Sequence, residues 1–398
     1  MHIILFDTDV RDALLPLTYT RPVCELRVGV LTIREKWEKM LGTLSSSFIT
    51  TEYLEPLFPI AIHDDNFLIN GSVLPSQGFV DVIRTLNSGE ALMLAGELMA
   101  ARLSKDSFEK LLIKQDLDEL VGYEIEPHLI QMLDSLTVMT ELSRDQIAFD
   151  IRLLGEADQV PDGLEIPGDY PIFIDPDARI ERALINASDG PVYIGPQAHI
   201  MDGATLRGPV SIGAGTIIKS HTFLSKGVCI GPSCEVAGEV KQSVILGYSN
   251  KSHEGYLGDS VIGEWCNLGA LTSNSNLRNT FTPVKMWNYS TGAMEVTQKN
   301  KCGFFMGDYS RTSILTKINS GTVVGVSCHL YGEEVMSSFI PSFSWGNSSN
   351  PTEYHLDKAL EAIAIFRSFK GASTSDEIRE LLTRIFKLTD IYRSKHNA

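Results

Sequence analysis

Residues 194–236 have an aliphatic side chain at every sixth position. The eight positions are Ile194, Ile200, Leu206, Ile212, Ile218, Leu224, Ile230 and Val236. Two places before each of them stands a small or β-branched residue: Val192, Ala198, Ala204, Val210, Thr216, Thr222, Val228 and Cys234. This period predicts a solenoid of hexapeptide repeats, in which each repeat supplies one short parallel strand and turns at a fixed corner. The alternative is a few alternating strands of an antiparallel sheet, which the absence of hairpin turn motifs disfavours.

The pattern divides the chain into three parts. Residues 1–165 mix short apolar runs at 3–6, 67–69 and 91–94 with helical patterns at 34–41 and 107–114, which predicts an α/β domain. A stretch rich in Asp, Gly and Pro at 156–171 predicts the boundary to a β-helix over 166–348. Its repeats are interrupted at 242–259, resume at Ile262 and Leu268, break again, and return from Met306.

The tail, residues 349–398, carries two helix-start signals. Asn350-Pro351-Thr352-Glu353 and Thr374-Ser375-Asp376-Glu377 both fit a capping box. Each is followed by apolar residues along one helical face. We therefore expect a helical cap packed on the end or side of the solenoid, rather than a membrane helix or a partner-binding helix.

Composition narrows the function. The chain has 398 residues and 43% hydrophobic residues, which suggests two or three domains with ordinary cores. There is no signal-peptide pattern and no membrane-spanning apolar run, so we expect a cytoplasmic protein. Its six cysteines form no Cys-x-x-Cys pair and predict reduced core thiols without a metal site. A net charge of −16 argues against nucleic acid and membrane partners but allows phosphorylated metabolites.

The candidate chemistry lies in the interrupted repeats. Residues 247–258 read Gly-Tyr-Ser-Asn-Lys-Ser-His-Glu-Gly-Tyr-Leu-Gly, which predicts a polar loop that leaves the regular coil. His253 stands there between Lys251 and Tyr256. A histidine in a loop is more often a solvated surface residue, but this polar setting within an apolar repeat favours a functional role.

Residues 241–276 resemble a known enzyme family. Lys251-Ser252-His253, Tyr256-Leu257-Gly258-Asp259 and Asn267-Leu268-Gly269-Ala270 are similar to motifs of the bifunctional N-acetylglucosamine-1-phosphate uridylyltransferase / glucosamine-1-phosphate N-acetyltransferase family. Further segments resemble a divergent branch of that family found in Bacteroidetes-like bacteria: Arg21-Pro22, Glu25-Leu26-Arg27, Ile69-Asn70-Gly71-Ser72, Asn186-Ala187-Ser188-Asp189-Gly190 and Phe339-Ile340-Pro341-Ser342-Phe343-Ser344-Trp345-Gly346. The resemblance implies a left-handed parallel β-helix and a cytoplasmic enzyme of nucleotide-sugar biosynthesis for the cell envelope.

The resemblance also implies roles for individual residues. His253 is the expected general base, because the amine of an amino sugar 1-phosphate must lose a proton before it attacks the thioester of acetyl-coenzyme A (acetyl-CoA). The expected substrate-binding residues are Lys241, Lys219, Tyr256, Asn267 and Lys251. Ala270 and Asn276 are expected near acetyl-CoA, the co-substrate. For Lys241 and Lys219 the alternative is a solvated surface lysine. Because the family's active site forms between subunits, the resemblance implies a homotrimer.

The amino-terminal domain departs from the nucleotidyltransferase pattern. The family has a Gly-x-Gly-Thr-Arg loop after its first strand, where this chain has Asp7, Thr8 and Asp9 followed by Arg11. Two carboxylates in a phosphate cradle repel a nucleotide unless a metal bridges them. Ser72 takes the slot of the family's magnesium-binding aspartate, so Mg²⁺ is expected only if this half is active. Arg11, Arg21 and Arg27 are the expected nucleotide-binding residues, for a nucleoside triphosphate.

Three functions remain open from the sequence. The first is an acetyl-CoA-dependent N-acetyltransferase with a divergent, impaired nucleotidyltransferase domain. The second is a sugar-1-phosphate nucleotidyltransferase whose β-helix only assembles the oligomer. The third is a non-enzymatic scaffold or metabolite sensor. The cluster around His253 favours the first, because a purely structural coil does not require a His, a Lys and a Tyr together.

Overall fold

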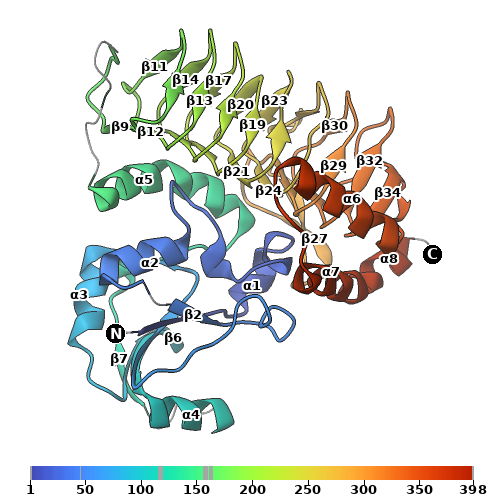
Figure 1. Ribbon diagram of the computed structural model, residues 1–398. Helices are drawn as coiled ribbons and strands as arrows, with labels where there is room; N and C mark the ends of the chain where they lie inside the picture. Colours follow the sequence, from blue (N-terminus) through green and yellow to red (C-terminus); the bar gives the residue numbers. More distant parts are fainter. Residues whose placement is uncertain (1, 45, 115–119, 156–159, 161–164, 397–398) are drawn as a thin grey trace. The chain divides into compact units, whose positions relative to one another are not determined.

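The computed structural model describes residues 2–44, 46–114, 120–155, 160 and 165–396 (Figure 1). The chain divides into two compact units. Unit 1 comprises Met1–Leu14, Arg21–Leu26 and Leu31–Asp134. Unit 2 comprises Leu15–Thr20, Arg27–Val30 and Ser135–Ala398. Half of the predicted boundary stretch at 156–171, residues 156–159 and 161–164, lies outside the described residues. None of the helices in the described ranges is long and apolar enough to cross a membrane.

Unit 1 is an α/β domain built on a mixed six-stranded sheet. Its strand order is β2-β1-β3-β6-β5-β7. The strands are β1 (His2–Phe6), β2 (Ser46–Ile49), β3 (Asp65–Asn70), β5 (Glu90–Leu94), β6 (Glu97–Ser104) and β7 (Val121–Glu124). Strand β1 is parallel to β2 and β3, whereas β6 is antiparallel to β3 and β5. A separate pair joins β4 (Val73–Leu74) to β8 (Gln131–Met132). The three apolar runs predicted as strands are confirmed as parts of β1, β3 and β5.

The helices of unit 1 each span ten residues or fewer. They are α1 (Val10–Ala13), α2 (Ile33–Leu41), α3 (Gln77–Thr85) and α4 (Lys105–Lys114), with short 3₁₀ turns η2 (Val23–Glu25) and η3 (Pro127–Leu129). A capping box between Thr32 and Glu35 starts α2, and Gly42 ends it in the left-handed conformation. Both predicted helical patterns are confirmed, in α2 and α4.

Unit 2 is the predicted left-handed parallel β-helix, with three faces. The first face is β9 (Ile172–Ile174), β12 (Val192–Ile194), β15 (Val210–Ile212), β18 (Val228–Ile230), β21 (Val244–Gly247), β24 (Val261–Glu264), β28 (Phe304–Met306), β31 (Thr322–Val324) and β33 (Phe339–Ile340). The second face is β10 (Arg179–Ile180), β13 (His199–Ile200), β16 (Ile217–Ile218), β19 (Glu235–Val236) and β22 (Asn250–Lys251), continued through a bridge at Asn267 by β29 (Arg311–Thr312), β32 (His329–Tyr331) and β34 (Ser344–Asn347). The third face is β11 (Leu184–Asn186), β14 (Thr205–Arg207), β17 (Phe223–Ser225), β20 (Glu239–Lys241) and β23 (Tyr256–Gly258), followed by β25 (Ser273–Asn274) and β30 (Lys317–Ile318).

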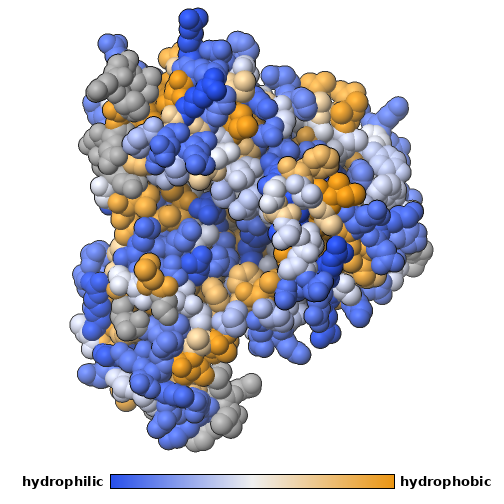
Figure 2. Space-filling view, viewed as in Figure 1, coloured by the Kyte–Doolittle hydropathy of each residue, from blue (hydrophilic) through white to orange (hydrophobic). Residues whose placement is uncertain are grey.

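The six-residue period arises because each coil turns three corners. Ile194, Ile212 and Ile230 are register partners on the first face, and at most 2% of each is exposed. Their side chains form the interior of the prism, so the apolar core runs as a column through successive coils. Apolar and hydrophilic residues alternate in small groups on the surface that Figure 2 shows.

The predicted interruption at 242–259 is wrong. This segment supplies β21, β22 and β23, one strand to each face, and so forms a complete coil. The coil before it is the short one: Ile212 pairs with Ile230, eighteen residues later, whereas Ile230 pairs with Ile245, only fifteen residues later. Because of this shortening, the inward-facing residues of the next coil no longer fall on the six-residue period. The pattern in the sequence therefore looks interrupted although the coil continues. The segment that does leave the coil is 275–303, between β25 and β28. It carries the antiparallel hairpin of β26 (Lys285–Asn288) and β27 (Ala293–Val296).

Helix α5 (Leu136–Leu154) packs on the first face of the β-helix, where it contacts β12, β15, β18, β21 and β24. Because this helix covers the first face, outward residues such as Ser211 and Cys229 are also buried. The 3₁₀ turn η1 (Leu17–Tyr19) also belongs to unit 2.

The carboxyl-terminal cap is present, but its first start signal is misplaced. Thr352–Glu353 form β35, antiparallel to β34, and α6 (Leu356–Phe369) starts only after His355. Helix α7 (Asp376–Leu388) is capped by Ser375, one residue beyond the predicted Thr374, and α8 (Asp390–His396) was not predicted. Helix α6 lies along the side of the β-helix: Arg311 Nη2 donates to the Ala362 carbonyl (3.0 Å), and the Arg367 guanidinium stacks on Trp265 at 4.2 Å.

Candidate active site on the third face of the beta-helix

His253 lies at the corner between the second and third faces. It falls in the turn between β22 and β23, and its side chain is exposed. The next coil meets this turn directly, since the backbone N–H of Leu271 donates to the carbonyl of Glu254 (2.8 Å). Ala270 therefore stands at the same corner, one coil on. His253, the predicted general base, and Ala270, predicted to lie near acetyl-CoA, are therefore neighbours in the fold.

Lys251 is an interior residue. It pairs with Val236 in the column that Ile200 and Ile218 occupy in earlier coils, and only 3% of it is exposed. Its ammonium group donates to the carbonyls of Ala237 and His253, both at 2.9 Å. Burial lowers the pKa of Lys251 to about 8. The side chain therefore ties the turn that carries His253 to the preceding coil, instead of facing a substrate on the surface.

The opposite edge of the third face carries a polar cluster. The amide nitrogen of Asn276 donates to the Tyr256 hydroxyl (3.0 Å) and to the Asp259 carboxylate. Burial raises the pKa of Tyr256 to about 12, and the nearby Asp259 acts in the same direction. Burial also raises the pKa of Asp259, opposed by its bond from Asn276 and by the charges of Lys241 and Lys301.

The third face thus brings four of the predicted residues into one region. His253 lies in the turn that leads into β23, and β23 itself spans three residues, about 10 Å of extended strand. Lys241 ends β20, the strand beside β23, and pairs with Gly258. A ligand on this face meets an imidazole at one edge, and a lysine, a phenol and an amide at the other. Asp259 and Lys301 lie near this cluster as well, and neither was predicted as a site residue. Asp259 stands in the quoted motif, whereas no motif marks Lys301.

Asn267 and Lys219 lie on the second face. Asn267 bridges Asn250 and Arg311 there, and the Lys219 ammonium group pairs with Glu235 Oε2 at 3.1 Å. Within one protomer neither residue lies on the face that carries Tyr256 and Lys241.

The predicted nucleotide-binding arginines are divided between the two units. Arg11 and Arg21 belong to unit 1, and both are buried. The Arg11 guanidinium contacts the Tyr53 hydroxyl and lies 3.7 Å from the Asp7 carboxylate. Arg27 belongs to unit 2, where it donates to the carbonyl of Val30.

Asp7 follows β1 in unit 1 and is held inside the loop that replaces the glycine-rich cradle. One of its carboxylate oxygens accepts from the backbone N–H of Val23 (2.9 Å), and the other accepts from the hydroxyl of Thr50 (2.7 Å). Burial raises the pKa of Asp7, although both hydrogen bonds oppose the shift. At the end of β3, both the backbone N–H and the hydroxyl of Ser72 donate to the Asn70 side chain.

Comparison with known proteins identifies the amino-terminal part. Residues 3–158 match the family model described as Sugar nucleotidyl transferase. A bifunctional protein GlmU from Methanocaldococcus jannaschii is 36% identical over 111 residues, which are 28% of this chain and 26% of that protein. A bifunctional sugar-1-phosphate nucleotidylyltransferase/acetyltransferase from Sulfurisphaera tokodaii is 34% identical over 125 residues, 31% of this chain and 30% of that protein. The match at residues 3–158 shows a sugar nucleotidyltransferase domain, and the names of these relatives fit the resemblance of the motifs to bifunctional nucleotidyltransferase–acetyltransferases.

These matches span less than a third of the two curated relatives. Among solved structures, the polySia specific acetyltransferase NeuO aligns with 52% of this chain and 96% of its own, at 9% identity and a TM-score of 0.29. This structural similarity is too low to carry an argument about function.

The residues at the ends of β1 and β3 do not fit a magnesium ion. Ser72 offers a hydroxyl that is already bonded to Asn70, and both oxygens of Asp7 accept hydrogen bonds from the protein. Mg²⁺ is held mainly by carboxylates and phosphate oxygens. Within the described ranges, no group of three or more His, Cys, Asp or Glu side chains is arranged to hold a metal.

Proposed function

We propose that this protein is an acetyl-CoA-dependent N-acetyltransferase that acts on an amino sugar 1-phosphate at the third face of its β-helix. The amine nitrogen attacks the thioester carbonyl carbon, the carbon–sulfur bond breaks, and coenzyme A leaves as the thiol. His253 accepts the proton that the amine loses. An imidazole suits this step because histidine side chains in general titrate near neutral pH.

The observation that carries the proposal is the arrangement across the third face. An exposed histidine stands at one edge, and Lys241 with the bonded pair Tyr256 and Asn276 stands at the other. Lys241 supplies positive charge for the sugar phosphate, and the phenol and amide supply hydrogen bonds for sugar hydroxyls. Ala270, at the corner beside His253, leaves room for the acetyl group.

A homotrimer is part of the proposal. Asn267 and Lys219 lie on the second face, so they join a substrate on the third face only from a neighbouring protomer. The flat faces of a β-helix are suited to such packing. Sedimentation equilibrium would test this assembly, and a monomer at assay concentration would rule it out.

The amino-terminal domain is proposed to be impaired in nucleotidyl transfer. Asp7 occupies the cradle in place of a glycine, and Ser72 replaces the metal-binding carboxylate. We expect no pyrophosphate release from UTP, N-acetylglucosamine 1-phosphate and Mg²⁺. Turnover in this assay would instead support the nucleotidyltransferase.

Thiol release from acetyl-CoA with glucosamine 1-phosphate tests the main proposal. The variant His253→Asn should lose activity by about 10²–10⁴-fold, the usual contribution of a general base. The matched control is His221→Asn, because His221 is exposed at the same corner two coils earlier and is already in the left-handed conformation that Asn tolerates. Equal activity of wild type and His253→Asn would remove His253 from the mechanism.

A further inference from the structure

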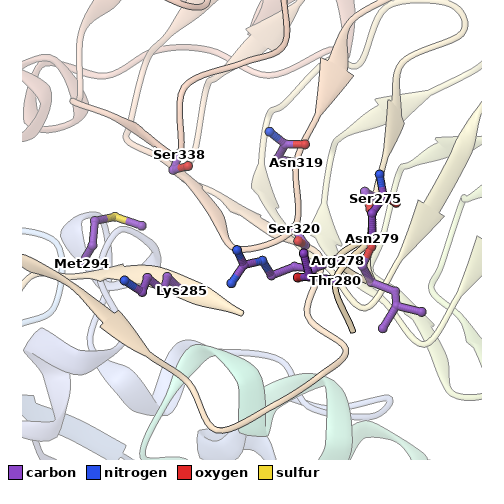
Figure 3. Close-up of a pocket in the computed structure, with 10 residues that line it drawn as sticks. Ser275, Arg278, Asn279, Thr280, Lys285, Met294, Asn319, Ser320 and Ser338 are labelled. Carbon is purple, nitrogen blue, oxygen red and sulfur yellow. The ribbon is translucent and has the colours of Figure 1, made fainter. Parts of the chain in front are cut away.

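A polar pocket of about 610 Å³ lies where segment 275–303 leaves the coil. Segment 275–303 forms one side of the pocket. The other side is formed by the turn after β30 and by the turn before β33. The lining residues are Ser275, Leu277, Arg278, Asn279, Thr280, Lys285, Met294, Asn319, Ser320 and Ser338. Figure 3 shows the guanidinium group of Arg278 in the middle of this set, with Lys285 and Met294 on one side and Asn319 on the other.

The charge of the pocket is opposite to that of the chain. The chain has 50 acidic and 34 basic residues, yet two cations and no carboxylates line this cavity. Arg278 donates to the carbonyl of Pro283 (3.1 Å), and neither Arg278 nor Lys285 forms an ion pair with any described residue. Because a cation in an acidic protein readily finds a carboxylate, two cations left without one around a single pocket indicate an anionic ligand.

The neutral lining groups suit the same ligand. Hydroxyl and amide donors converge from three coils: Ser275 from the end of the third face, Asn319 and Ser320 after β30, and Ser338 before β33. Leu277 and Met294 add an apolar wall that can contact a ring. Guanidinium groups bind phosphate through paired hydrogen bonds, and hydroxyls and amides complete such sites.

We infer that this pocket binds the phosphate groups of a phosphorylated ligand, with Arg278 and Lys285 as the cations. Phosphate esters are carried both by an amino sugar 1-phosphate and by the nucleotide end of acetyl-CoA. The distance favours the second source, an argument that rests on the proposed function. From β23 to β30 there are two coil steps, about 10 Å, and crossing the third face from His253 adds about 10 Å. The pantetheine arm, about four extended residues or roughly 14 Å long, spans the resulting diagonal. A single sugar ring is too short to reach from His253 to this pocket.

Calorimetric titration of the full chain with adenosine 3′,5′-bisphosphate, glucosamine 1-phosphate and inorganic phosphate tests the inference. The double variant Arg278→Gln/Lys285→Gln should bind the preferred phosphate ligand at least tenfold more weakly. The control Lys317→Gln removes an exposed lysine of the same region that does not line the pocket, and should bind like the wild type. Adenosine without phosphates should bind wild type and double variant equally.

Three results would overturn the inference: no binding of any phosphate probe to the wild type, equal affinity of wild type and double variant, or equal weakening by Lys317→Gln. Preference for the bisphosphate identifies the nucleotide end of the co-substrate, and preference for glucosamine 1-phosphate identifies the sugar phosphate. The test is independent of turnover. Absence of thiol release by the wild-type protein would refute the proposed function and leave the phosphate pocket standing.

Discussion

Replacing Lys251 by Met should change how the stability of the β-helix depends on pH. Lys251 lies in an interior column that is otherwise aliphatic, and burial lowers its pKa to about 8 from the ordinary 10.5. This difference corresponds to about 3 kcal/mol in favour of the neutral amine. Methionine has a similar length, is apolar, and fills the same column without a charge.

The sign follows from proton binding. Between about pH 8 and pH 10.5 the unfolded state binds the proton on Lys251 and the folded state does not, so the wild type gains stability as the pH rises. The Met variant lacks this gain. Relative to the variant, the wild type should therefore become more stable by about 3 kcal/mol across that window, whereas below about pH 8 the difference should be constant.

Urea unfolding followed by tryptophan fluorescence provides the measurement, because Trp265, Trp287 and Trp345 all belong to unit 2. The matched control is Val236→Met, an apolar exchange in the same column one coil earlier. Its stability difference from the wild type should not depend on pH. If the difference between Lys251→Met and wild type changes by less than about 1 kcal/mol from pH 7 to pH 10.5, Lys251 is not buried as a destabilised ammonium ion.

Three further predictions follow from specific contacts. In Gly231→Ala the new Cβ would lie 1.6 Å from the carbonyl oxygen of Leu246, so the free energy of unfolding should fall by about 3 kcal/mol in urea titrations. Arg393→Met removes a buried guanidinium that bonds five groups in and beside the carboxyl-terminal cap, and should cost about 2–4 kcal/mol in the same measurement. Tyr256→Phe removes the hydroxyl that accepts from Asn276, and should raise KM for the sugar phosphate with little change in stability; an unchanged KM would place the sugar elsewhere.

Much of the fold is readable from local patterns. The column through Ile194, Ile212 and Ile230 repeats in sequence because each coil contributes one inward side chain per face, so the β-helix was predictable without long-range information. The strands of unit 1 were readable from their short apolar runs at 3–6, 67–69 and 91–94. The start of α6 was not, because Thr352 and Glu353 pair with β34, and this tertiary pairing overrides a local helix signal.

The sequence by itself determined the solenoid and drew attention to the residues around His253. Only the tertiary structure decided which of them lie on the surface and which lie in the interior of the β-helix. The three-residue shortening after Ile230 moved Lys251 into the interior column, where a lysine must bond backbone carbonyls to offset the loss of water. It also decided that 275–303, and not 242–259, leaves the coil. A phase shift and a true excursion interrupt a repeat alike in sequence, and only strand pairing distinguishes them.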